Sequence, residues 1–129
     1  MIKEKEFEVG VPLEFEISRP MKQIVFKIPI TNLKWRCCIS DDIIDTSFVE
    51  VRVKPYKNYT IEFINFMRLV VALFKSKIES SDCTVAEEIV SWIKQGLEKE
   101  YPLHEFDVKL VFLEKDKETG LVVAVEVEA

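Results

Sequence analysis

The sequence contains few residues that interrupt regular structure and few that bind metals. Its 129 residues include 3 glycines and 5 prolines, too few for a flexible linker or a low-complexity segment. The 3 cysteines and 1 histidine form no CxxC or HExxH pattern, so we expect no metal site. The chain also lacks a GxSxG elbow and a glycine-rich phosphate loop. These absences exclude the common zinc, serine-hydrolase and P-loop motifs.

Long hydrophobic runs are missing as well. No apolar stretch approaches the ~20 residues that span a bilayer, and the first ten residues mix charges where a signal peptide would have an apolar core. We therefore expect a cytoplasmic protein without a membrane partner. Three cysteines cannot all pair within one chain and the cytosol keeps thiols reduced, while a bond between the adjacent Cys37 and Cys38 would be strained. The net charge of −5 gives no general attraction to phosphate backbones.

Alternating apolar and polar residues predict several strands. The first alternating segment is interrupted near Gly10 and Pro12, and two polar turns are expected at 55–58 and 114–120. The predicted strands cover 5–17, 22–30, 47–54, 106–113 and 121–128.

Two helices are predicted between these strands. The segment 60–78 has no proline or glycine and is apolar over most of its circumference, which indicates burial on more than one side. Its polar residues Glu62, Asn65 and Arg68 are three apart and predict a narrow polar stripe. The second helix is predicted to begin at Thr84, which forms a capping box with Glu87, and to end before residue 102.

The segregation of strands and helices predicts an α+β fold, with an antiparallel sheet and two antiparallel helices on one face. The length fits one domain, 1–129, in which residues 1–30 form an N-terminal strand extension. The first helix is too apolar for one sheet to cover, so we expect a second subunit to cover the rest.

One pattern of residues resembles a known family. Cys38 precedes a strand, Asp45 comes seven residues after Cys38, and that strand ends at Pro55; Glu62 and the pair 82–83 then come later in the same order. This order resembles the tunnelling fold, in particular the 7-cyano-7-deazaguanine (preQ0) reductase family. The resemblance covers roughly residues 35–93. It implies a homo-oligomer in which strands of neighbouring subunits continue into a barrel, with sites between subunits.

The sequence also departs from that family. The reductases follow their glutamate with lysines that bind NADPH, whereas this chain has Ile64 and Phe66 there and only Arg68 is basic. We therefore expect no cofactor. Where the family has His–Glu, this chain has Ser80 and Ser81. A sister group without the NADPH motif comprises amidinotransferases, which add ammonia to the nitrile in archaeal tRNA and form archaeosine.

The resemblance implies nitrile chemistry. A thiolate attacks a nitrile carbon to form a thioimide, and a nearby acid supplies a proton to the nitrile nitrogen. Cys38 is the predicted nucleophile and Asp45 the predicted proton donor. The residues predicted to bind the deazapurine substrate are Glu62, Ser80, Ser81 and Asp82.

Three interpretations of the function remain open, and the nitrile chemistry on Cys38 is the first. Free cysteines are often small buried hydrophobic residues, so Cys37, Cys38 and Cys83 have a packing interpretation, and the single His104 has a structural one. The chain would then be a non-catalytic binding or assembly protein. An NADPH-dependent nitrile reductase with an altered motif is the third reading. The sequence leaves open whether the base is free or part of a tRNA.

Overall fold

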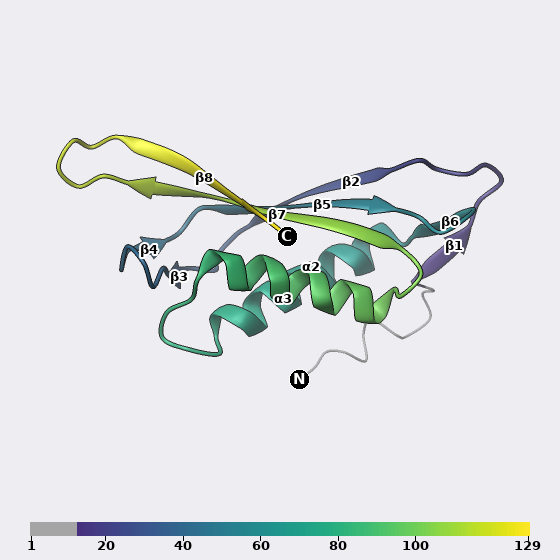
Figure 1. Cartoon of the computed structure of the whole chain (residues 1–129), viewed down its shortest axis with the longest axis horizontal. Helices are drawn as coiled ribbons and strands as arrows, with labels where there is room; N and C mark the ends of the chain where they lie inside the picture. The colour runs from purple at the N-terminus through teal and green to yellow at the C-terminus, as the bar shows by residue number, and fades with distance from the viewer. Residues whose placement is uncertain (1–12) are drawn as a thin grey trace.

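The computed structural model describes residues 13–129, and they form two layers (Figure 1). One layer is an antiparallel sheet of four strands, and the other is a pair of helices that packs on one face of that sheet. The predicted α+β class, with an antiparallel sheet and two helices, is thereby confirmed. Assembly into a barrel stays a prediction.

The main sheet has the order β2-β5-β7-β8 with every neighbouring pair antiparallel. Strand β5 is central, and Val49, Val51 and Val53 on its inner face are completely buried. The predicted alternation in this segment is therefore correct. The bounds of the four strands are β2 (Ile24–Ile30), β5 (Ser47–Lys54), β7 (Glu105–Lys115) and β8 (Val122–Glu128).

The helices are α2 (Phe63–Ile78) and α3 (Ala86–Glu100), and each buries one stripe of side chains. In α2 the stripe recurs every four residues, which places it on a single face toward the sheet. The corresponding residues of α3 face the same core. The fully buried members are Phe66, Val70 and Phe74 of α2 and Ile89, Ile93 and Leu97 of α3.

Two details of the predicted helices are wrong. Asn65 is buried, with 3% of its surface exposed, so it does not share an exposed polar stripe with Glu62 and Arg68. The capping box at Thr84 does not form, because α3 begins two residues later and its N-cap, Val85, makes no side-chain bond. The backbone of Thr84 pairs instead with Cys37, directly after β3, which holds it in an extended conformation.

Two short antiparallel pairs were not predicted as such. Strand β1 (Glu14–Glu16) pairs with β6 (Tyr59–Ile61), and β3 (Trp35–Arg36) pairs with β4 (Ile43–Ile44). The segment expected as an N-terminal extension, 1–30, contributes β1 and β2, and the predicted strand before residue 13 lies outside the described residues.

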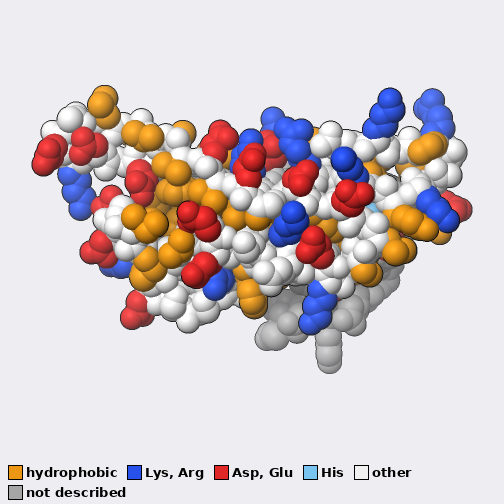
Figure 2. Space-filling view, in the orientation of Figure 1, with side chains coloured by type: hydrophobic (Ala, Val, Ile, Leu, Met, Phe, Trp, Pro, Cys, Tyr) orange, Lys and Arg blue, Asp and Glu red, His pale blue; other side chains and the backbone are white. Residues whose placement is uncertain are grey.

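The surface carries apolar side chains at both ends of the long axis (Figure 2). On α2, Phe63, Ile64 and Met67 are exposed. Between the two ends of the long axis, charged side chains of both signs lie across the visible face. Among the described residues, no helix combines the length and hydrophobicity needed to cross a membrane.

Candidate functional site

The two adjacent cysteines lie where β3 ends beside the start of α3. Cys37 is buried, with 5% of its surface exposed, whereas Cys38 belongs to an exposed turn. The backbone N–H of Thr84 donates to the carbonyl of Arg36 at 2.8 Å, and the N–H of Cys38 donates to the carbonyl of Thr84 at 3.1 Å. These two bonds fix the place of Cys38 relative to the segment that leads into α3.

Cys38 is bonded to Cys83, with a Cα–Cα distance of 5.0 Å. The expectation of three reduced cysteines is therefore wrong for this structure, and so is the packing interpretation of Cys83. The reason is the bridge at Thr84, which brings Cys83 beside Cys38 across 45 residues of sequence. Cys37 is the free cysteine among the described residues. Nucleophilic attack by Cys38 requires prior reduction of this bond.

Asp45 lies directly after β4 with its side chain exposed, and the hydroxyl of Thr46 donates to its Oδ1 at 3.4 Å. It lines a groove of about 630 Å³, which lies between the β3–β4 hairpin and the β7–β8 hairpin. Cys38 is not among the groove's lining residues. A single chain therefore does not bring the predicted nucleophile and the predicted proton donor into one described groove.

Most charges around the groove are paired. Nη1 of Arg36 lies 3.2 Å from Oδ1 of Asp41, and Nζ of Lys117 lies 3.4 Å from Oδ1 of Asp42. In the part of the chain that the structure describes, Asp45 has no such ion pair. Within those same residues, no group of three or more histidine, cysteine or acidic side chains is placed to hold a metal ion.

Three of the predicted substrate-binding residues lie in the turn between α2 and α3. The hydroxyl of Ser80 donates to the carbonyl of Lys77, and that of Ser81 donates to the carbonyl of Cys83, both at 2.6 Å. Asp82 is exposed. The disulfide places this turn next to Cys38, but both hydroxyls stabilise the turn itself.

Glu62 lies at the opposite end of α2. Its carboxylate caps the helix by accepting from the N–H of Ile64 at 2.7 Å and from the N–H of Asn65 at 3.1 Å. A helix of 16 residues is about 24 Å long. Glu62 and the turn at Ser80 are thus separated by the length of α2, so a single chain does not bring them into one site.

His104 and Tyr101 are both buried near the end of α3, and the centroids of their rings lie 6.0 Å apart. The backbone N–H of Tyr56 donates to Nδ1 of His104 at 2.8 Å, and Nε2 of His104 is hydrogen-bonded to Glu14. Nδ1 is therefore the acceptor nitrogen, and the ring ties β1 to the start of β7. Burial, reinforced by the negative charges of Glu100, Glu14 and Glu62, raises the pKa of Tyr101 far above its usual value. These contacts agree with the structural interpretation of His104.

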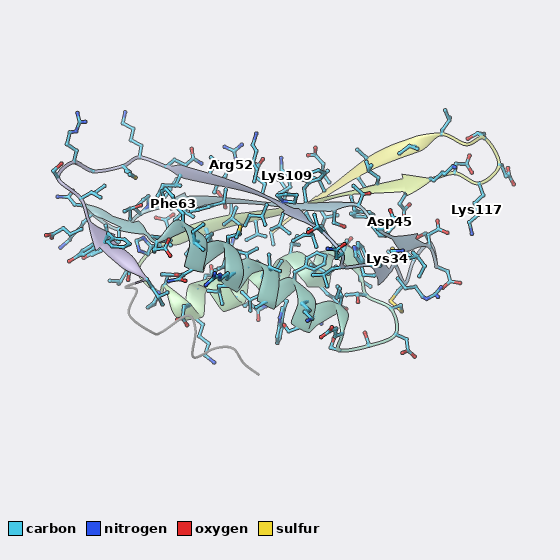
Figure 3. All side chains as sticks on the ribbon, turned by 180° about the vertical axis from the view of Figure 1, so that it is seen from behind. Lys34, Asp45, Arg52, Phe63, Lys109 and Lys117 are labelled. Atoms are coloured by element: carbon cyan, nitrogen blue, oxygen red, sulfur yellow. A yellow bond between two sulfur atoms is a disulfide. The ribbon has the colours of Figure 1, made fainter. Side chains whose placement is uncertain are left out.

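No sequence pattern indicated the groove's apolar residues. Ile43, Leu113 and Val122 line the groove and are 51%, 40% and 58% exposed. Segment 114–120 is polar and reads as a solvated turn, yet its Lys117 reaches Asp42 of the other hairpin. Figure 3 shows Asp45 and Lys117 at the same end of the molecule, with Phe63 at the other end.

No family model matches the chain, and no curated protein is significantly similar to it. Among solved structures, the apo form of the archaeosine synthase QueF-Like is similar, with 18% sequence identity and a TM-score of 0.44. The similarity covers 84% of this chain and 94% of that chain. A likeness at this level does not assign the chain to a family.

Proposed function

We propose that the chain modifies the nitrile of 7-cyano-7-deazaguanine through a covalent thioimide on Cys38, with Asp45 as the proton donor. The observation that carries the proposal is the orientation of the adjacent cysteines: Cys37 is buried and Cys38 lies in an exposed turn. Cys38 is therefore the member of the pair that a substrate can reach after reduction of its bond to Cys83. The order of Cys38, Asp45, Pro55 and Cys83 in the sequence supports the same assignment.

The chemistry begins when the Cys38 thiolate adds to the nitrile carbon. A carbon–sulfur bond forms, one π pair of the nitrile moves to nitrogen, and protonated Asp45 supplies the proton that gives the neutral thioimide. Ammonia then adds to the thioimide carbon. Collapse of that adduct expels the Cys38 thiolate, leaves an amidine and returns a proton to Asp45. No electrons are gained or lost, so this route needs no nicotinamide cofactor.

Assembly into a homo-oligomer is part of the proposal. Strands β2 and β8 are the edges of the main sheet, and each has one side without a partner strand in the described chain. The β2 region carries Lys22 and Lys27, whereas β8 carries Glu126 and Glu128. Pairing of β8 with β2 of a second copy would bring these opposite charges together. It would also provide the neighbouring subunit that a site combining Glu62 with Cys38 requires.

A second candidate is a non-catalytic binding or assembly protein. It is favoured by the contacts of three predicted site residues, because the sulfur of Cys38 is bonded to Cys83 and the hydroxyls of Ser80 and Ser81 bond to backbone carbonyls. All three groups then have structural partners. This candidate predicts reversible binding at most, without a covalent adduct.

Intact-mass spectrometry of the reduced protein, incubated with 7-cyano-7-deazaguanine, tests the proposal. The mass should increase by that of one nitrile molecule per chain, and Cys38→Ala should show no increase. Asp45→Asn should form the adduct about a hundredfold more slowly, because the positioned acid is lost. Cys37→Ala is the matched control and should keep the adduct. Addition of NADPH should cause no oxidation of the cofactor; nitrile-dependent oxidation would support a reductase instead.

A further inference from the structure

The β7–β8 hairpin extends past the helices at one end of the molecule (Figure 1). The pairing of β7 with β5 stops where Phe112 lies opposite Ser47. Strands β7 and β8 stay paired beyond that point, as far as Lys115 and Val122. Residues 113–124 therefore form a two-stranded projection from the sheet, and we call this segment the arm.

The arm exposes an uninterrupted run of apolar side chains. Leu121, Val122, Val123 and Ala124 are all exposed, and the first three have 65%, 58% and 54% of their surface in contact with solvent. Because side chains alternate across a strand, Val122 and Val123 point to opposite faces of the arm. Consecutive exposed apolar residues are unfavourable in water and mark a surface that a partner covers.

Contacts with the β3–β4 hairpin hold the arm in place. The hydroxyl of Ser40 donates to Oε1 of Glu114 at 2.8 Å, in a partly buried contact. Lys117 adds the ion pair with Asp42 nearer the tip of the arm. A segment that is already ordered loses less conformational freedom when it binds. The arm is therefore preorganised to contact a partner.

The opposite end of the long axis carries a second apolar surface (Figure 2). It consists of exposed side chains from β1, β6 and the first turn of α2, and Figure 3 shows Phe63 at this end, far from Lys117. Phe63 and Ile64 lie next to each other at the start of α2, where about half of each residue is exposed, 51% and 52%. We call the set the end patch, and its members are Phe15, Tyr59, Phe63 and Ile64.

The two ends differ in charge. At the end with the arm, residues 35–46 contain three acidic residues and one basic residue, and residues 114–120 contain three acidic and two basic ones. At the end with the patch, the turns 17–23 and 54–58 contain four basic residues and no acidic one. The N–H of Ile17 donates to the carbonyl of Asn58 at 2.9 Å, so these two turns lie side by side.

The acidic residues beside the end patch offset little of that positive charge. Glu14 is hydrogen-bonded to His104, and Glu62 caps α2. Glu16 is exposed on β1. Basic residues therefore outnumber the acidic ones around the end patch, whereas acidic residues predominate around the arm.

We propose that the arm of one copy of this chain docks on the end patch of a second copy, in a head-to-tail contact. The apolar run of the arm covers Phe63 and Ile64 of the second copy, and the acidic surroundings of the arm face the basic turns 17–23 and 54–58. An arm-to-arm contact brings like charges together instead. Because the two surfaces differ, the contact is heterologous, and each pair keeps one free arm and one free end patch. This contact does not depend on the nitrile chemistry, and it leaves the edges of the main sheet free for the pairing of β8 with β2.

Sedimentation velocity of two full-chain variants, separately and mixed, tests the contact. Leu121→Lys alters the arm outside β8, and Ile64→Asp alters the end patch. Each variant alone should associate at least about tenfold more weakly than the wild type, because a charge replaces an apolar contact and meets charge of the same sign. An equimolar mixture should form a complex that neither variant forms alone, since the intact end patch of the first binds the intact arm of the second. Ala72→Asp, at an exposed position in the middle of α2, is the matched control and should associate like the wild type.

Three results would overturn the proposal. Equal association of the wild type and both variants would place assembly on other surfaces, such as the sheet edges. A mixture without a new complex would show that the two surfaces do not bind each other. A wild-type chain that stays monomeric at every concentration would leave the arm without a second copy as its partner. If either variant alters the circular dichroism spectrum, Val122→Lys or Met67→Asp replaces it with the same expected loss and the same recovery on mixing.

Discussion

The sulfur of Cys38 is bonded to the sulfur of Cys83, 45 residues later in the chain. The bond connects the turn after β3 to the segment that leads into α3, beside the backbone bridge between Cys37 and Thr84. It therefore determines two properties of the protein at once. It stabilises the fold by closing a long loop, and it keeps the predicted nucleophile unreactive until it is reduced.

Reduction of this bond should destabilise the protein. A crosslink that closes a loop of this length contributes about 3–4 kcal/mol by limiting the unfolded chain. Urea unfolding should therefore show a lower midpoint in the presence of dithiothreitol, and Cys83→Ser should unfold at that lower midpoint with or without it. A midpoint in the wild type that does not respond to the reductant would show that the crosslink is absent in solution.

Tyr101 should make the protein sensitive to alkaline pH. Its pKa is raised in the folded state, mainly by burial and then by Glu100. The unfolded chain ionises this phenol near pH 10 while the folded chain does not, so its contribution to stability is complete below about pH 10 and is lost as pH rises above it. Thermal unfolding between pH 9 and 11 should show this decline, and Tyr101→Phe should reduce it.

The same variant tests the burial of the phenol. The hydroxyl of Tyr101 is buried and has no hydrogen-bond partner among the described residues, so Tyr101→Phe should cost less than about 1 kcal/mol at pH 7. Tyr59→Phe, at an exposed position, is the matched control and should keep the alkaline decline. An equal decline in wild type and Tyr101→Phe would contradict the assignment.

Gly96 is required for close packing of the two helices. A Cβ atom at this position would lie 2.6 Å from Cδ2 of Leu73 on α2. Gly96→Ala should therefore lower the free energy of unfolding by at most about 1–2 kcal/mol, because the end of the leucine side chain must change rotamer while the higher helix propensity of alanine offsets about 1 kcal/mol of that cost. The double variant with Leu73→Ala should recover part of that loss, as measured by chemical denaturation. Strictly additive losses would show that the two side chains do not compete for space.

The long elements could be predicted from the sequence because their patterns are local. The period-2 alternation of Val49, Val51 and Val53 reflects a sheet with one covered face, and the structure has the strand where the pattern places it. The apolar run of α2 likewise gives a helix that ends at Ile78. The predicted start of this helix at residue 60 is wrong, because α2 begins at Phe63 and residues 59–61 form strand β6. Strand β6 pairs with β1, which lies more than 40 residues earlier in the sequence.

The candidate site depends on contacts that no local pattern contains. Strands β3 and β4 have two residues each, too short to show a period. The bond from Cys38 to Cys83 and the extended backbone of Thr84 depend on segments more than 40 residues apart. The groove requires the β7–β8 hairpin to extend past the helices, and the polar segment 114–120 resembles any solvated turn. Sequence patterns therefore made Asp45 a candidate but did not predict its surroundings.

The reactivity of Cys38 toward the nitrile is the central claim, and alkylation competition measures it most directly. The reduced protein is treated with iodoacetamide with and without 7-cyano-7-deazaguanine, and peptides that contain Cys38 and Cys83 are quantified by tandem mass spectrometry. We predict that the nitrile protects Cys38 from alkylation while Cys83 is labelled to the same extent in both samples. Equal alkylation of Cys38 with and without the nitrile would contradict the account.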